Sequence, residues 1–337
     1  MAEMIENLVS TIIPVFNRPV MLRQAVDSVL AQSWRPIEII ICDDGSTDET
    51  VALGPALARN HPEVRYLWNP NRGAGPAREA GRQLARGEFI QYLDSDDTLW
   101  PDKFSRQIEA LRAHPECGAA YGWIRLCPED GPPGERPHKW SGRALPTLFP
   151  WLLADRWWNT DTPLWRRTVC DAIGPWSDFR YSQDWEYDAR AGGLGVRLAH
   201  TPEFVCDQRH HAADRQTGHG RWLTPPERVR FFSLLLQHAC TTGLGADAPE
   251  IKHFSRWVFA HARQCAELGD ESAAIDLFAL ARRTAGGTAA DMQSFALLVR
   301  LLGWRRAASL AETVHHWTKA GPGRFTRKQS WMEEHGQ

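Results

Sequence analysis

The first 127 residues alternate between short apolar runs and stretches with helical periodicity, and this alternation constrains the fold most strongly. The predicted buried strands are STIIPVF (10–16), IEIIICDD (37–44), VRYLWN (64–69) and EFIQYLD (88–94). Helices are predicted after the first strand, from about Pro76 to Ala85, and from Pro101 onward. Strands that alternate with helices favour right-handed crossovers, so the sequence predicts an α/β fold with a mostly parallel, Rossmann-like sheet.

Composition divides the chain into parts. Residues 1–223 carry the alternating pattern and are expected to form one domain, with a first half at about 8–127 and a second half at about 128–223 that opens with a Pro/Gly-rich loop. Strand signals disappear after that point, and residues 224–319 are predicted to be a helical C-terminal region. Residues 320–337 are predicted to be a disordered tail.

Charge and cysteine usage narrow the class of protein. The formal net charge is -2 and the pI is about 6.7, which argues against a nucleic-acid partner. No run of eighteen apolar residues and no secretory signal pattern occurs in the sequence, so a membrane span is not expected. The seven cysteines are scattered and form no C-x-x-C pair, which is typical of reduced thiols in a cytoplasmic protein.

Polar residues gather where the predicted strands end. They are Asn17 and Arg18, Asp43 and Asp44, Asn71 to Gly75, and Asp94 to Asp97. In an open parallel sheet, ligands bind beyond the carboxyl ends of the strands, so these ends predict one crevice. Capping of the following helices is the simpler explanation for any single site. It does not explain why Asp94, Asp96 and Asp97 crowd together without a matching basic cluster.

A dinucleotide-binding fold is the obvious competitor, and the sequence argues against it. The first turn, PVFNRP, contains no glycine, and GAGPAR at 73–78 has Arg78 at the third glycine position. A nucleotide site built from carboxylates requires a divalent cation to hold the phosphates. Asp94 and Asp96 alternate at a strand end and therefore project the same way. Such hard oxygen ligands favour Mg²⁺ or Mn²⁺.

Five elements in order resemble those of a family 2 glycosyltransferase of the GT-A fold. They are STIIPVFNRP, EIIICDDGSTDET, NRGAGPAR, GEFIQYLDSDDTLWPDKF and YSQDWEYDAR, and the resemblance covers roughly residues 8–215. It implies an inverting, metal-dependent enzyme that takes a sugar from a nucleotide-diphosphate donor. The nucleotide-sugar half would then be 8–127 and the acceptor half 128–223.

The resemblance also assigns roles to residues of the donor site. Phe16 would stack on the nucleobase, and Asp44 would bind a uracil-like edge. Asp94 and Asp96 would be the D-x-D pair, with Asp96 as the direct metal ligand and Asp94 as nucleotide or second metal ligand. The remaining nucleotide-binding positions would be Pro14, Asn17, Arg18, Arg78 and Ser95.

Asp184, in QDWEYDAR, matches the position of the family's catalytic base. Glu186 and Asp188 are competing candidates, and solvated acids on a helix are the simpler interpretation of both. The sequence departs from the family pattern at two places, since Glu79 replaces an asparagine and Gln183 replaces a glutamate beside the base. The second departure removes a carboxylate that would raise the pKa of Asp184.

Weaker indications concern the acceptor and the metal. The adjacent Trp157 and Trp158 are not expected to face a core together, so one of them is a candidate wall against a sugar ring, with core packing as the alternative. In related enzymes the loop after the base often returns a histidine to the metal, which makes His210 or His211 a candidate ligand. The C-terminal helices interleave Leu, Trp and Arg as surface-binding helices do, although a packed bundle is the simpler reading.

The sequence therefore predicts transfer of a sugar from a UDP-sugar to a hydroxyl of a carbohydrate or lipid-linked glycan acceptor, in polysaccharide or glycoconjugate assembly. The expected cofactor is Mn²⁺ or Mg²⁺, and the expected location is the cytoplasm or the inner face of the membrane. The alternative is a non-catalytic nucleotide-sugar-binding or scaffold protein with the same fold. A nucleotidyltransferase would usually carry a glycine-rich activating loop that this sequence lacks.

Overall fold

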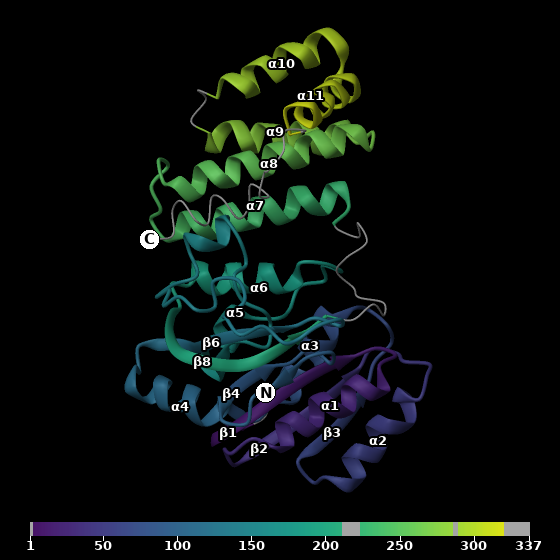
Figure 1. Cartoon of the computed structure of the whole chain (residues 1–337), viewed down its shortest axis with the longest axis vertical. Coiled ribbons are helices and arrows are strands. Elements are labelled where there is room, and N and C mark those ends of the chain that lie inside the picture. Colours follow the sequence, from purple (N-terminus) through teal and green to yellow (C-terminus); the bar gives the residue numbers. More distant parts are fainter. Residues whose placement is uncertain (1–2, 211–222, 286–288, 320–337) are drawn as a thin grey trace. The chain divides into compact units, whose positions relative to one another are not determined.

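The structure is a computed structural model that describes residues 3–210, 223–285 and 289–319 (Figure 1). The chain divides into two compact units. Unit 1 comprises Met1–Glu227 and Ser233–Gly245, and unit 2 comprises Arg228–Phe232 and Ala246–Gln337. The predicted tail, 320–337, lies outside the described residues.

Unit 1 contains an eight-stranded sheet in the order β3-β2-β1-β4-β7-β6-β8-β5. Its strands are β1 (Ile5–Val15), β2 (Ile37–Asp43), β3 (Val64–Trp68), β4 (Gly87–Tyr92), β5 (Thr98–Leu99), β6 (Cys117–Cys127), β7 (Leu164–Arg166) and β8 (Arg197–Arg209). β1 pairs in parallel with β2 and β4, β2 with β3, and β6 with β8, whereas β7 is antiparallel to both its neighbours. The predicted mostly parallel α/β sheet is confirmed.

The register of these strands brings their carboxyl ends to one edge. Val15 at the end of β1 lies opposite Asp43 at the end of β2, and Ile12 lies opposite Tyr92 at the end of β4. The residues that follow each strand therefore start from neighbouring points. β1 and β2 are almost entirely buried, as expected for parallel strands covered on both faces.

The helices of unit 1 cover this sheet (Figure 1). They are α1 (Pro19–Leu30), α2 (Thr50–Asn60), α3 (Ala74–Leu84), α4 (Lys103–Ala113), the 3₁₀ helix η1 (Trp151–Leu153), α5 (Arg167–Ile173) and α6 (Gln183–Gly193). α3 lies very close to β1 and β2, because a Cβ atom on Gly81 would come within 2.5 Å of the Ile12 side chain and 2.6 Å of Cys42 Sγ. This close approach packs the second half of α3 directly against β1 and β2.

An irregular but buried segment connects η1 to β7. All residues from 152 to 165 are buried, although most of them belong to no helix or strand. The expectation that Trp157 or Trp158 faces outward is wrong, since both are fully buried. Trp158 packs edge-on against Tyr121 and Trp165, and Trp157 packs on Trp158. A segment without regular structure can bury consecutive side chains because it is not bound by the alternation of a strand.

Unit 2 is helical and contains α8 (Pro249–Glu267), α9 (Glu271–Thr284), α10 (Ala290–Leu302) and α11 (Trp304–Lys319). The preceding helix α7 (Pro225–Thr241) is divided between the units, with Arg228–Phe232 in unit 2. α8 and α9 are joined at Gly269-Asp270, where the Asp270 carboxylate accepts the N–H of Ala273 at 2.9 Å and caps α9. Among the helices of the described residues, none combines the length and apolar character needed to cross a membrane.

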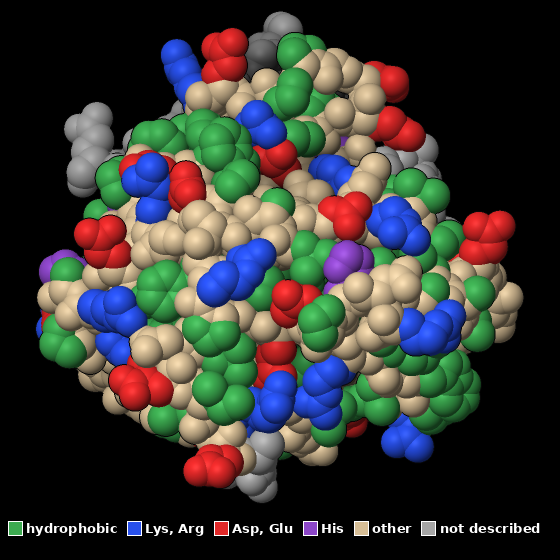
Figure 2. Space-filling model, turned by 90° about the horizontal axis from the view of Figure 1, so that it is seen from below, with side chains coloured by type: hydrophobic (Ala, Val, Ile, Leu, Met, Phe, Trp, Pro, Cys, Tyr) green, Lys and Arg blue, Asp and Glu red, His purple; other side chains and the backbone are tan. Residues whose placement is uncertain are grey.

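Charged side chains of both signs are mixed on the face shown in Figure 2. Lys and Arg side chains lie next to Asp and Glu side chains across this face, in keeping with the formal net charge of -2. Mixing of this kind favours local ion pairs over a long-range attractive field.

Candidate active site

The loops after β1 and β2 are tied to each other. The Asn17 side-chain oxygen accepts the N–H of Thr47 at 2.8 Å, and the Asn17 N–H donates to Ser46 Oγ at 2.9 Å. Asn17 adopts φ 51°, which turns the chain sharply after the strand. Phe16, just before this turn, is 40% exposed although it follows a fully buried stretch. Its ring is therefore available to a ligand at the strand ends.

Asp44 fastens the loop that follows β3. Its two carboxylate oxygens accept the N–H groups of Arg72 at 2.9 Å and Gly73 at 2.8 Å. Burial raises the pKa of Asp44, and these two N–H groups oppose that rise without cancelling it. Asp44 also lines a cavity of about 360 Å³ together with Asn69, Arg72, Glu79, Trp176 and Asp178. A cavity of this size can take part of a small-molecule ligand.

Two arginines reach the acidic loop after β4. Arg18 pairs with Asp96, with its Nη1 2.8 Å from Asp96 Oδ2. Arg78 is buried and donates to Asp94 Oδ1. Ser95, between the two acids, is also buried. The structure thus brings the predicted Arg18, Arg78, Asp94 and Asp96 together at one edge of the sheet, while Pro14 lies buried within β1.

A buried carboxylate from elsewhere in the chain, Asp161, lies against Asp94 and Asp97 of this loop. Oxygen atoms of Asp94, Asp97 and Asp161 all lie within 4.8 Å of one another. Burial, followed by the mutual repulsion of the carboxylates, raises the pKa of Asp97 well above its ordinary value and that of Asp161 to about 7. Asp161 Oδ2 is buried and has no hydrogen-bond donor. Close, partly unsatisfied carboxylate oxygens fit a hard divalent cation such as Mg²⁺ or Mn²⁺.

Asp184, the predicted base, lies in the first turn of α6. The N-cap residue Ser182 has φ 59°, and the Asp184 side chain remains 30% exposed. Arg156 Nη1 lies 2.8 Å from Asp184 Oδ2. Burial alone would raise the pKa of Asp184, but Arg156, then Arg78, outweigh it and lower the pKa. The largest lowering influence on the pKa of Asp184 is therefore Arg156, an arginine that the sequence did not indicate.

The competing acids on α6 are engaged elsewhere. Asp188 is 3% exposed, and its Oδ2 lies 2.6 Å from Arg156 Nε and 2.8 Å from Trp158 Nε1. Glu186 is 5% exposed and forms two hydrogen bonds with Arg190, at 2.8 and 2.9 Å. The expectation that both are solvated surface acids is wrong, because α6 turns this face toward the interior. Asp184 keeps the most open carboxylate of the three.

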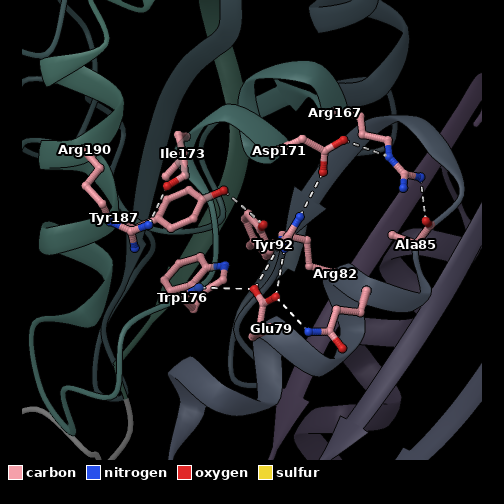
Figure 3. A network of polar contacts seen from close by, with 11 residues as sticks. Glu79, Arg82, Ala85, Tyr92, Arg167, Asp171, Ile173, Trp176, Tyr187 and Arg190 are labelled. Carbon is pink, nitrogen blue, oxygen red and sulfur yellow. Dashed lines mark hydrogen bonds and ion pairs between the residues drawn. The ribbon is translucent and has the colours of Figure 1, made fainter. Parts of the chain in front are cut away.

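Glu79, where the family often has asparagine, anchors a network of polar contacts (Figure 3). It binds Arg82 through two contacts of 2.9 Å and accepts the backbone N–H of Trp176 at 3.2 Å. Arg82 Nη1 also donates to Asp171 Oδ1 on α5 at 2.9 Å. Burial alone would raise the pKa of Glu79, but Arg82 lowers it overall. The network ties α3, which carries Arg78, to the loop that precedes α6.

Trp176 completes the link between these elements. Its ring stacks on Tyr187 of α6, with centroids 4.2 Å apart and planes 10° apart. The Arg78 guanidinium lies 4.8 Å from the centre of the same ring. Tyr92, at the end of β4, meets Tyr187 hydroxyl to hydroxyl at 3.2 Å (Figure 3). The donor side of the site and the helix of Asp184 are therefore held through one aromatic cluster.

The histidine prediction is only partly described by the structure. His210 is exposed at the end of β8, and its N–H donates to the Cys127 carbonyl at 2.7 Å. His211 lies outside the described residues. The cluster of acidic oxygens found among the described residues contains neither histidine nor Asp96. The roles of His210 and Asp96 toward a metal stay predictions.

Sequence reasoning missed Arg156 and Asp161. Both lie in the buried segment 152–165, which has neither strand alternation nor helical spacing. Their chemistry was the only indication in the sequence. Arginine and aspartate in a run rich in tryptophan are rarely buried unless each has a partner. This indication does not say which residue the partner is. Only the fold brings Arg156 to Asp184, at 2.8 Å, and Asp161 to the N–H of Asp94, also at 2.8 Å.

Comparison with known proteins shows which family the N-terminal part of the chain resembles. Residues 10–171 match the family model described as Glycosyl transferase family 2. An uncharacterized glycosyltransferase of Escherichia coli K12, YibD, is 39% identical over 98 residues, which are 29% of this chain and 28% of that protein. A chondroitin synthase of Escherichia coli is 36% identical over 124 residues, 37% of this chain and 18% of that protein. The matches thus span less than a third of these relatives.

Solved structures resemble this chain over more of its length than the sequence relatives do. Staphylococcus aureus TarS 1–349, in complex with UDP-GlcNAc, has a TM-score of 0.69 at 14% identity and covers 91% of both chains. The mannosyltransferase PcManGT of Pyrobaculum calidifontis, in complex with GDP-Man and Mn²⁺, has a TM-score of 0.50 at 20% identity, covering 93% of this chain and 88% of that one. At such low identity these likenesses concern the fold alone. With its sheet and these structural matches, the chain has the GT-A fold, and its residues 10–171 match glycosyltransferase family 2.

Proposed function

We propose that this protein transfers a sugar from a nucleotide-diphosphate donor to a hydroxyl acceptor with inversion at the anomeric carbon. The observation that carries the proposal is the placement of Asp184. It lies beside Arg156 at 2.8 Å, and Arg78, which binds Asp94 of the acidic loop, also contributes to its lowered pKa. A candidate base and a candidate donor site thus share one electrostatic cluster.

The donor would lie across the carboxyl ends of β1, β2 and β4. Phe16 offers an exposed ring for the nucleobase, and Asp44 lies buried at the neighbouring strand end. Arg18 and Arg78, each paired with an aspartate of the acidic loop, supply positive charge for the diphosphate. A UDP-sugar is the proposed donor class. TarS, which shares the fold, has been crystallised with UDP-GlcNAc and with UDP.

A divalent cation would be held by the acidic loop after β4, with Asp94 and either Asp96 or Asp97 as ligands. When bound, Mn²⁺ or Mg²⁺ would neutralise negative charge on the leaving diphosphate. Before binding, the carboxylate of Asp96 is balanced by Arg18 and that of Asp94 by Arg78. Each of these arginines offsets part of the repulsion between neighbouring acids of the loop.

Asp184 would accept the proton of the acceptor hydroxyl as that oxygen attacks the anomeric carbon. Because its pKa is lowered, Asp184 stays ionised throughout the neutral range and is ready to accept a proton. Its 30% exposed side chain leaves one side open to an acceptor. Arg156 fixes the carboxylate from the buried side. Trp157 and Trp158 support this arrangement from the core and do not form the acceptor wall.

The broader assignments are also proposals. Residues 1–223 would be the catalytic domain, with a carbohydrate or lipid-linked glycan as acceptor and a role in polysaccharide or glycoconjugate assembly. A cytoplasmic location, with peripheral contact to the inner face of a membrane through the C-terminal helices, agrees with the exposed Leu297, Leu301 and Leu302 of α10. No nucleic-acid partner is proposed, given the mixed charges of the surface in Figure 2.

A thermal-shift panel of UDP, GDP, dTDP and CDP, each with Mn²⁺, Mg²⁺ or EDTA, tests the donor assignment. We expect a metal-dependent rise in melting temperature for UDP above the others. The variant Asp184→Asn should keep that shift while sugar transfer or donor hydrolysis falls by about 10²–10⁴-fold. Near-normal turnover would place the base elsewhere. A nucleotide-dependent shift without any release of UDP from a UDP-sugar would favour the non-catalytic scaffold.

A further inference from the structure

Asp161 joins the acidic loop from a distant part of the chain. The loop that carries Asp94 and Asp97 follows β4, whereas Asp161 belongs to the buried segment 152–165. Oxygens of the three side chains lie within 4.8 Å of one another. Asp161 is fully buried and Asp97 is 6% exposed, while the Asp94 side chain is 33% exposed. The cluster therefore has a closed inner end and one partly open member.

The hydrogen bonds of the cluster leave a gap on its inner side. Asp161 Oδ1 accepts the N–H of Asp94 at 2.8 Å, and Asp97 Oδ1 accepts the N–H of Arg209 at 2.8 Å. Asp161 Oδ2 accepts no hydrogen bond although it is buried. An ionised oxygen in that situation is costly unless a positive charge or a proton reaches it.

The buried Lys103 does not fill this gap. Lys103 is 1% exposed, and its Nζ donates to Gln107 Oε1 at 2.6 Å and to the Thr162 carbonyl at 2.8 Å. Arg78 donates to Asp94 Oδ1 and forms no hydrogen bond with the unsatisfied Asp161 Oδ2. Two buried carboxylates thus lie close together, while Lys103 donates to Gln107 and Thr162 and Arg78 donates to Asp94.

We infer that Asp161 is a protein ligand of a divalent cation, which it holds together with Asp94 and Asp97. This deepens the proposed function and rests on it only for the nucleotide that the cation would meet. Oxygen ligands from three carboxylates suit Mg²⁺ or Mn²⁺. A residue outside the D-x-D-D element would then fasten the cation to the core of the domain.

The isosteric variant Asp161→Asn isolates the ligand role. An asparagine oxygen can still accept the N–H of Asp94, and its amide NH₂ can donate to Asp97 in place of the unsatisfied oxygen. The apo variant should therefore melt at or above the temperature of the wild type in EDTA. Loss of metal binding would then reflect the lost ligand, because the fold is kept.

The experiment measures Mn²⁺ binding to the full chain by calorimetry and by the electron paramagnetic resonance of free Mn²⁺, with and without UDP. We expect the wild type to bind Mn²⁺, and Asp161→Asn to bind it about tenfold more weakly or worse. Asp97→Asn should show the same loss. Asp171→Asn, an acid on α5 paired with Arg82 and Arg167, is the matched control and should bind as the wild type does.

Two outcomes overturn the inference. One is unchanged Mn²⁺ affinity of Asp161→Asn both with and without UDP, and the other is no Mn²⁺ binding by the wild type in either condition. A proton shared between Asp97 and Asp161 would produce the first outcome. Failure of the proposed function has a different signature, namely Mn²⁺ binding that depends on Asp161 while none of the nucleoside diphosphates binds. Metal-dependent UDP binding that survives in Asp161→Asn would sink the inference and leave the proposed function standing.

Discussion

Replacing Arg156 with methionine should damage the site more than any surface change. The Arg156 side chain is 10% exposed and lies 2.8 Å from Asp184 and 2.6 Å from Asp188, whose side chain is 4% exposed. Removing one partner of a buried ion pair typically costs about 3–5 kcal/mol, because it leaves uncompensated charge in the interior. Here one cation serves two carboxylates, so Arg156→Met should lie toward the upper end of that range.

The dependence of this loss on pH follows from the two acids. In the folded wild type the pKa of Asp184 is lowered, so its contribution to stability is present above the unfolded value of about 3.9 and is lost as the pH falls through the folded value. The pKa of Asp188 is raised by burial even beside Arg156. Without the arginine both values should rise, so the variant should be most destabilised at neutral pH and least at about pH 4–5.

Urea unfolding followed by far-ultraviolet circular dichroism between pH 4 and pH 8 measures this difference. The control is a double-mutant cycle with Asp188→Asn, since the double variant removes one of the two stranded charges and should recover part of the loss. A loss below about 1 kcal/mol at pH 7, the size of a surface ion pair, would refute the reasoning. So would a loss that does not change with pH.

Two further predictions concern packing and a buried amine. Gly81→Ala should destabilise unit 1 by about 1–3 kcal/mol because the added Cβ would overlap Ile12 and Cys42. The control Gly245→Ala should be nearly neutral, because its Cβ would meet nothing within 4 Å. Equal melting temperatures of the two variants would contradict this prediction. Burial lowers the pKa of Lys103 from 10.5 to about 7, so between those values the unfolded chain binds more protons and stability should rise with pH. Lys103→Met should flatten that rise in urea titrations at pH 7, 8 and 9, and an identical slope would show that Lys103 is not responsible.

The part of the site that follows the strand ends could be predicted from the sequence, because parallel neighbouring strands end at the same edge of a sheet. Once four strands are recognised, the residues after each strand must share an edge, and the register of β1 with β2 and β4 places Asn17, Asp44 and Asp94 there. The family resemblance, and not this rule, predicts Arg78 near the nucleotide; in the structure Arg78 binds Asp94 of the acidic loop. Elements of regular structure carry their own geometry, so their ends can be located before any contact is known.

The part of the site that lies in the buried segment 152–165 could not be predicted from the sequence. Arg156 and Asp161 belong to a buried segment of irregular backbone, where no repeat relates sequence position to direction. The prediction for Trp157 and Trp158 failed for the same reason, since it assumed that adjacent residues point to opposite sides as they do in a strand. The acidic loop shows a related limit, because spacing placed Asp94 and Asp96 on one side but gave no indication that Arg18 would pair with Asp96.

The stacking of Trp176 gives the protein a built-in optical probe. The Arg78 guanidinium lies 4.8 Å from the centre of the Trp176 ring while it also binds Asp94. Any ligand that draws this charge away alters the electric field at the indole, and indole emission shifts with local field. Binding of an unlabelled nucleotide to this site should therefore be visible as a change in intrinsic emission, and Trp176→Phe would separate that signal from the other tryptophans among the sixteen.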